Sequence, residues 1–205
     1  MLMHVADSMN FRVNTFTHIL EGYKLADKMR AHGAGASTFS DWWGYKFEVK
    51  DAIPYNAALM HEQGVLVAMN SDDAEMARRL NHEAAKAVKY GGVPETEALK
   101  MITINPAKLM HIDDRVGSIE AGKDADLVIW SDHPLSVYSK VEKTFIDGKR
   151  FYDRERSEAM KQRDERERAR IISKMMADPD KSKGDKAGEN PNDKHYHCDD
   201  VDEEI

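Results

Sequence analysis

Residues 65–73 read VLVAMNSDD, an apolar run that ends in small and acidic side chains. A run of aliphatic and β-branched residues directly after a glycine, here Gly64, predicts a strand buried on both faces, as in a parallel α/β sheet. Asp72 would stand at the carboxyl end of that strand, the edge at which α/β barrels place their chemistry. A carboxylate there can ligate a metal and accept a proton from water. The same acidic pair could instead cap a helix that begins near Ala74, because aspartate is a favoured N-cap residue.

Strands and helices alternate along the first 110 residues. Two further strands are expected at 11–17 and 36–40, and helices at 1–10, 21–32, 55–63, 74–90 and 94–104, the last of these ending at Asn105-Pro106. This alternation predicts βαβ units and a parallel sheet. Because a full barrel needs eight strands, three strands indicate either a small open sheet or part of a barrel.

The pattern changes after Pro106. Short strands around two glycine turns, and a strand at 141–146 followed by the turn Asp147-Gly148, predict antiparallel pieces. Residues 154–176 are helix-forming and densely charged, with a thin apolar stripe, and the composition from Asp178 onward predicts disorder. We therefore expect four regions: barrel strands and helices at 1–110, a returning β segment at 111–153, a charged helix at 154–177 and a disordered acidic tail at 178–205.

The composition of the chain limits the classes of protein to which it can belong. The chain has 205 residues and a formal net charge of -7, a balance that does not favour nucleic acid as a partner. Its one cysteine, Cys198, excludes an internal disulfide framework. No apolar run is long enough to cross a bilayer, and residues 1–4 have no signal character, so the compartment is left open.

His18 and Asp72 both follow predicted strands, and this shared position is more informative than either residue alone. Side chains at neighbouring strand ends converge over a barrel mouth, so an imidazole nitrogen and a carboxylate oxygen could bind one zinc-like ion. Catalytic zinc normally takes three protein ligands, so others would have to come from elsewhere. The alternative for His18 is an ordinary core or rim histidine.

Two other groups of side chains carry possible chemistry. Asp41, Trp42 and Trp43 follow the 36–40 strand and could line a substrate pocket, or form a loop that is packed down by its tryptophans. Residues 195–198 read HYHC, but adjacent ligands in an acidic tail lack the spacing of a structural zinc site, so adventitious metal binding is the better interpretation.

Four segments together resemble the C-terminal half of the metal-dependent amidohydrolases, near the imidazolonepropionase-like branch. They are HILEGYK at 18–24, NSD at 70–72, TINPA at 103–107 and, above all, VGSIEAGKDADLV at 116–128. The last segment is highly specific, and the other three occur in the order found in the family. The resemblance runs from about residue 1 to residue 152.

The resemblance implies an α/β fold, the C-terminal portion of a distorted (β/α)8 TIM-like barrel, with residues 117–151 forming part of a small β-sandwich. It implies that His18 binds a divalent metal, with zinc as the expected ion, after the sixth strand. It also implies that Asp72, after the eighth strand, ligates the metal and shuttles a proton as the catalytic residue. The implied reaction is hydrolysis of a C–N bond in a small-molecule amide, cyclic or linear, by metal-activated water.

The departures from the family pattern are equally informative. The paired His-x-His after the first strand, the fourth-strand ligand and the fifth-strand histidine have no counterpart here. We therefore expect a C-terminal part of a longer hydrolase, inactive without the missing N-terminal half of the barrel. The alternatives are a non-catalytic remnant or interaction module, and a barrel completed by a separate N-terminal chain. His111 stands where many members have glycine, at a cost of about 1 kcal/mol if that position is left-handed.

Overall fold

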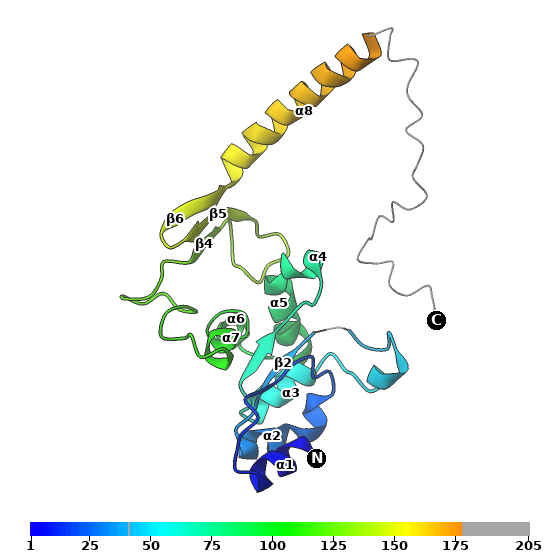
Figure 1. Cartoon of the computed structure of the whole chain (residues 1–205), viewed down its shortest axis with the longest axis vertical. Helices are drawn as coiled ribbons and strands as arrows, with labels where there is room; N and C mark the ends of the chain where they lie inside the picture. The colour runs from blue at the N-terminus through cyan, green and yellow to red at the C-terminus, as the bar shows by residue number, and fades with distance from the viewer. Residues whose placement is uncertain (41, 178–205) are drawn as a thin grey trace. The chain divides into compact units, whose positions relative to one another are not determined.

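The computed structural model describes residues 1–40 and 42–177, which divide into two units (Figure 1). The first unit is Met1–Glu155, and the second begins at Arg156. Each unit is described by itself. Asp41 and the predicted disordered tail at 178–205 lie outside the described residues.

A parallel sheet lies at the centre of the first unit. Its strands are β1 (Thr15–Phe16), β2 (Gly35–Thr38) and β3 (Val67–Met69), in the order β1-β2-β3 and all parallel. Every residue of β3 is buried, as the apolar run predicted. The alternation of strands and helices is therefore confirmed as an α/β arrangement, although β1 is only two residues long where the sequence predicted seven.

Helices and short 3-10 segments cover this sheet and enclose one main core. The first part of the chain forms α1 (Leu2–Ser8), η1 (Gly22–Leu25), α2 (Ala26–His32), η2 (Phe47–Val49) and α3 (Asn56–Glu62). Met29, Met60, Val67 and Met101 are fully buried, and they belong to one apolar cluster. Three of these four are methionines, whose unbranched side chains fill irregular gaps well.

The helices after β3 differ from the sequence prediction. The expected helix at 74–90 is two helices, α4 (Ala74–Ala77) and α5 (Leu80–Gly91), because Arg79 leaves the helical conformation with φ of -127°. No glycine or proline marks this break, so the sequence pattern could not show it.

The segment expected at 94–104 is also divided, into α6 (Glu95–Lys100) and α7 (Ile104–Leu109). The interruption lets the Met69 amide donate to the Met101 carbonyl at 2.9 Å, and the Asn105 side chain donate to the Val67 carbonyl at 2.8 Å. These two hydrogen bonds pair backbone groups on the edge of β3 that does not face β2. Asn105-Pro106 therefore lies in the first turn of α7 rather than at a helix end, a position where the missing N–H of proline costs little.

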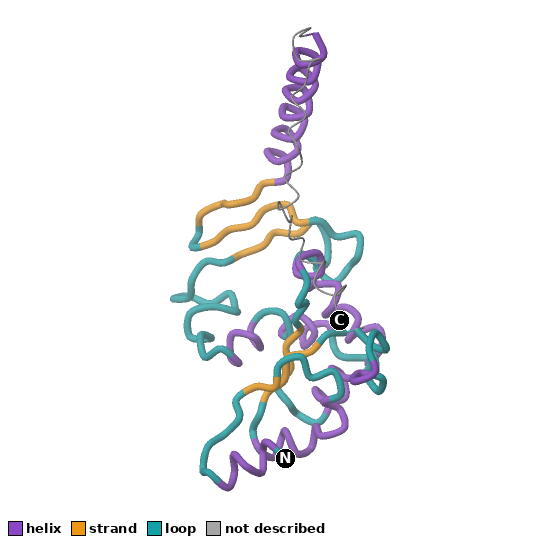
Figure 2. The backbone as a smooth tube through the Cα atoms, turned by 45° about the vertical axis from the view of Figure 1, so that its right-hand side comes forward, coloured by secondary structure: helices purple, strands orange, loops and turns teal. Residues whose placement is uncertain are grey.

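A second, antiparallel sheet contains β4 (Leu127–Trp130), β5 (Val141–Ile146) and β6 (Lys149–Asp153), in that order (Figure 2). Asp147 and Gly148 connect the last two strands with φ of 50° and 72°. Positive φ at both central residues is the signature of a two-residue hairpin turn, so the predicted Asp-Gly turn is confirmed.

Helix α8 (Arg154–Ala177) contains all the described residues of the second unit and, as predicted, is one continuous charged helix. None of its residues is buried, and its apolar side chains, such as Ile171 and Met175, are exposed. Among the described helices, none combines the length and the apolar character needed to cross a membrane.

His111 has a φ of 58°, so the condition for strain at this position, a left-handed backbone, is met. We predict that His111→Gly raises the free energy of unfolding by about 1 kcal/mol, because glycine adopts this conformation without steric cost. His61→Gly, in α3, is the matched control and should lower it by a similar amount. Chemical denaturation of both variants provides the measurement; a less stable His111→Gly protein would contradict the assignment of strain to this residue.

Candidate active site

His18 and Asp72 follow β1 and β3, and the parallel sheet brings their side chains to the same edge. His18 Nε2 lies 4.0 Å from Asp72 Oδ1, and the two side chains are 51% and 60% exposed. Both residues have left-handed backbones, with φ of 58° and 50°. Such conformations are uncommon for residues other than glycine and cluster at functional sites.

Asp73, not Asp72, caps the helix that follows β3. Its Oδ1 atom accepts hydrogen bonds from the backbone amides of Glu75 at 2.9 Å and Met76 at 2.8 Å. The sequence left open which aspartate would cap this helix. Because Asp73 does so, the carboxylate of Asp72 is left beside His18.

A buried amide fixes the backbone immediately after His18. Asn56 is 2% exposed, and its Nδ2 donates to the Ile19 carbonyl at 2.8 Å and to Thr38 Oγ1 at 3.0 Å. Its Oδ1 accepts from the Tyr23 amide at 2.8 Å. The Ile19 amide donates to the Ser37 carbonyl at 3.1 Å. The sequence analysis missed Asn56; its only signal is an asparagine followed by four apolar residues at the start of a helix.

An aromatic stack supports the imidazole ring of His18. The ring lies 5.5 Å from that of Phe39, with an angle of 11° between their planes, and Phe39 stacks in turn on Trp42 at 4.7 Å. The Trp42 indole N–H points at Met76 Sδ, 2.9 Å away in α4. The stack thus joins the carboxyl ends of β1 and β2 to the helix that follows Asp72.

The three residues predicted to line a substrate pocket have different environments. Asp41 lies outside the described residues. Trp42 is packed into the stack, which matches the alternative of a loop held down by its tryptophans. Trp43 is 44% exposed, and in the same loop Tyr45 and Phe47 are 53% and 80% exposed. A role for this loop in substrate binding remains a prediction.

The loop is tied back to η1 by Asp51. Its carboxylate lies 2.7 Å from Lys24 Nζ, and its carbonyl accepts a hydrogen bond from the Tyr23 hydroxyl at 2.9 Å. The hydrogen bonds from Lys24 to Asp51 and Glu21 raise the pKa of the Lys24 ammonium group, and the same contact lowers the pKa of Asp51. Both groups are exposed to solvent, so this pair orients the loop more than it stabilises the fold.

The geometry of His18 and Asp72 can be compared with that of a metal site. Two ligands that each lie about 2.0–2.2 Å from one ion can be up to roughly 4 Å apart, so the separation of His18 and Asp72 fits a shared metal. Among residues 1–40 and 42–177, no cluster of three or more His, Cys, Asp or Glu side chains could hold an ion. The segment HYHC at 195–198 lies outside the described part of the chain.

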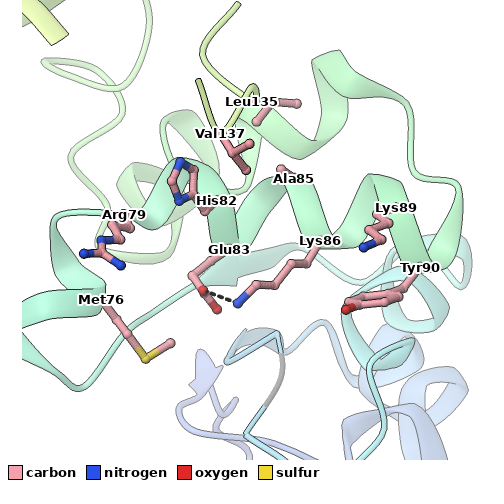
Figure 3. A pocket seen from close by; sticks show the side chains of 10 residues that line it. All are labelled: Met76, Arg79, His82, Glu83, Ala85, Lys86, Lys89, Tyr90, Leu135 and Val137. Atoms are coloured by element: carbon pink, nitrogen blue, oxygen red, sulfur yellow. Dashed lines mark hydrogen bonds and ion pairs between the residues drawn. The ribbon is translucent and has the colours of Figure 1, made fainter. Parts of the chain in front are cut away.

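A cavity of about 660 Å³ lies along α5, and neither His18 nor Asp72 lines it (Figure 3). Glu83 is buried in its wall, 2.7 Å from Lys86 Nζ, and accepts a hydrogen bond from the Ser40 hydroxyl. This bond ties α5 to the residues that follow β2. Glu83 therefore helps to hold the loop that carries Trp42. The sequence analysis missed this residue, as it missed Asn56.

Fold and geometry define a class of protein: an α/β chain that presents an imidazole and a carboxylate together at the carboxyl edge of a parallel sheet. Residues 50–151 match the model of the amidohydrolase family. The protein named amidohydrolase tasK from Hapsidospora irregularis is 29% identical over 72% of this chain and 16% of its own length. Imidazolonepropionase from Thermoplasma volcanium is 32% identical over 53% of this chain and 28% of its own length.

A solved structure agrees with these sequence matches. The crystal structure of an amidohydrolase from Thermotoga maritima MSB8 superposes with a TM-score of 0.68 at 34% identity, over 74% of this chain and 40% of that one. Residues 50–151 of the chain therefore belong to the amidohydrolase superfamily. The chain spans less than a third of the curated relatives described above and less than half of the solved structure.

The aromatic stack generates a prediction about the ring of His18. We expect Phe39→Leu to move the ring proton resonances of His18 downfield, because the shielding of the stacked phenyl ring is lost, and to lower the free energy of unfolding by about 1 kcal/mol. Phe47→Leu, at an 80% exposed ring, is the control and should change neither. The measurement is the carbon–proton NMR spectrum of the histidine rings. Unchanged His18 resonances in Phe39→Leu would refute the stack.

Proposed function

We propose that this chain supplies the His18 and Asp72 part of an amidohydrolase active site that hydrolyses a C–N bond. One observation carries the proposal: the two side chains meet at 4.0 Å at the carboxyl edge of the sheet, while Asp73 caps the following helix. Capping the helix needs only Asp73, so it does not account for the carboxylate of Asp72 beside His18.

The roles of the two residues follow from their chemistry. A divalent metal, zinc in our proposal, lowers the pKa of water and polarises a carbonyl when it is bound. His18 would hold the metal through Nε2, and Asp72 through a carboxylate oxygen. Asp72 would also take a proton from the attacking water and deliver it to the leaving nitrogen as the C–N bond breaks.

The proposed substrate is a small-molecule amide, cyclic or linear. Imidazolonepropionase, the name of the Thermoplasma relative, supports this choice, and assignment to its branch of the superfamily is part of the proposal. The exposed ring of Trp43 would form an aromatic wall of the pocket, with Asp41 and Trp42 beside it.

The remaining metal ligands are proposed to come from other strands of a (β/α)8 barrel. The described parallel sheet has three strands, whereas a closed barrel has eight, and catalytic zinc takes three protein ligands. We place these ligands on an N-terminal half of the barrel, in the same or a separate polypeptide. The antiparallel β4-β5-β6 sheet would be one part of the accompanying β-sandwich. On this proposal, residues 1–205 alone are inactive.

A non-catalytic interaction module is the second candidate. Two features favour it: the described residues contain no cluster of three or more possible metal ligands, and no residue of α8 is buried. On this reading His18 and Asp72 would contribute nothing to metal binding.

Metal titration separates the two candidates. We expect Zn²⁺ to bind the full chain weakly, with the His18 ring resonances responding first, and His18→Ala or Asp72→Asn to weaken binding about tenfold or more. His61→Ala, which removes a histidine outside the pair, is the control and should leave the affinity unchanged. The measurement is NMR titration with calorimetry. Equal Zn²⁺ affinity in all four proteins would refute the enzyme proposal and favour the interaction module.

A further inference from the structure

A second cavity, of about 330 Å³, lies between the start of α5 and the antiparallel sheet, within the first unit. It is lined by residues of both: Arg78, Arg79, Asn81, His82, Trp130, Ser139, Lys140, Val141, Tyr152 and Arg154. Five of these ten side chains carry or can accept a positive charge. None is a carboxylate, although the whole chain has a net charge of -7.

The positive charge of this cavity is only partly neutralised. Arg78 is paired with Glu75 at 2.6 Å, and Arg154 with Glu142 at 2.7 Å, in both cases by acids that do not line the cavity. Within residues 1–40 and 42–177, Arg79 and Lys140 form no ion pair. They face the cavity from opposite walls, one from the start of α5 and the other from the connection between β4 and β5.

The two walls are fixed to each other by hydrogen bonds. Asn81, which is 7% exposed, donates from Nδ2 to the Pro134 carbonyl at 2.7 Å, so α5 is bonded to the connection between β4 and β5. That connection is closed by two bonds between Ser131 and Lys140: the Ser131 amide donates to the Lys140 carbonyl, and the Lys140 amide donates to Ser131 Oγ, each at 2.9 Å. Leu135, between them, packs into the main core. A ligand would therefore meet walls that are already in place, which lowers the entropic cost of binding.

The backbone adds to the positive potential of the cavity. Helix α5 has 12 residues, and no side chain caps its first turn, since Arg79 at the N-cap makes no capping hydrogen bond. Its first amide groups therefore carry the partial positive charge of a helix start next to Arg79 and Asn81. Trp130 and Tyr152 provide aromatic surface in the same cavity.

We propose that this cavity binds a phosphate group, carried either by inorganic phosphate or by a small phosphorylated organic molecule. A phosphate carries nearly two negative charges and three acceptor oxygens, which match Arg79 and Lys140 on opposite walls better than a single carboxylate does. The guanidinium of Arg79 can bind two oxygens at once, while Lys140 acts as a point charge. The volume suits a small molecule. This proposal does not depend on the His18 and Asp72 site.

Titration of the full chain tests the proposal. The probes are inorganic phosphate, pyrophosphate and adenosine 5′-monophosphate at constant ionic strength, followed by amide NMR shifts and tryptophan fluorescence. We expect one saturable site, with the largest shifts at the amides of Leu80, Asn81 and Lys140. Arg79→Gln and Lys140→Gln should each weaken binding by at least about tenfold.

Lys89→Gln is the matched control, because Lys89 lies on the same helix, contacts the Tyr90 ring and does not line this cavity. It should leave the affinity unchanged. If adenosine 5′-monophosphate binds more tightly than inorganic phosphate, and quenches tryptophan fluorescence in a way that Trp130→Phe abolishes, the result supports a phosphorylated organic ligand. If inorganic phosphate binds with equal affinity, the result supports the free anion.

Two results would overturn the proposal. One is the absence of saturation with all three probes. The other is equal weakening in Lys89→Gln and in both cavity variants, which would show an adventitious ion only. Amide spectra of each variant confirm that it is folded, and because Arg79 and Lys140 lie on different walls, a folding defect in one variant leaves the other to decide.

Discussion

The carboxamide of Asn56 is the interaction on which the candidate site depends most. It is buried in α3, and it bonds the residue after His18, the end of β2 and the start of η1 at once. A buried amide that loses its partners costs more than an apolar residue in the same place, so this network specifies one arrangement of the three segments. The aromatic stack then orients the His18 ring on a backbone that is already fixed.

Much of this arrangement could be predicted from local sequence, because the signals are local. The apolar run after Gly64 predicts a buried strand, and parallel strands end at the same edge of a sheet, which brings His18 and Asp72 together. The Asp147-Gly148 turn and the long charged helix were predicted from residues within a few positions of each other. In each case the residues within the segment itself determine its conformation.

Features that depend on distant partners could not be predicted. The role of Asn56 depends on Thr38 and Ile19, which become its neighbours only in the folded sheet. The division of the helix after β3 depends on tertiary contacts, since neither glycine nor proline stands at the break. The sequence also could not decide between Asp72 and Asp73 as the cap, because both fit the pattern and only the three-dimensional turn selects one.

The left-handed conformations of His18 and Asp72 bear on how such a chain changes over evolutionary time. At both positions glycine would adopt the backbone conformation at a lower steric cost than the residue present, so folding alone gives no advantage to histidine or aspartate. A glycine at either position would ease the backbone, but it would also remove one of the two side chains that meet at the edge of the sheet.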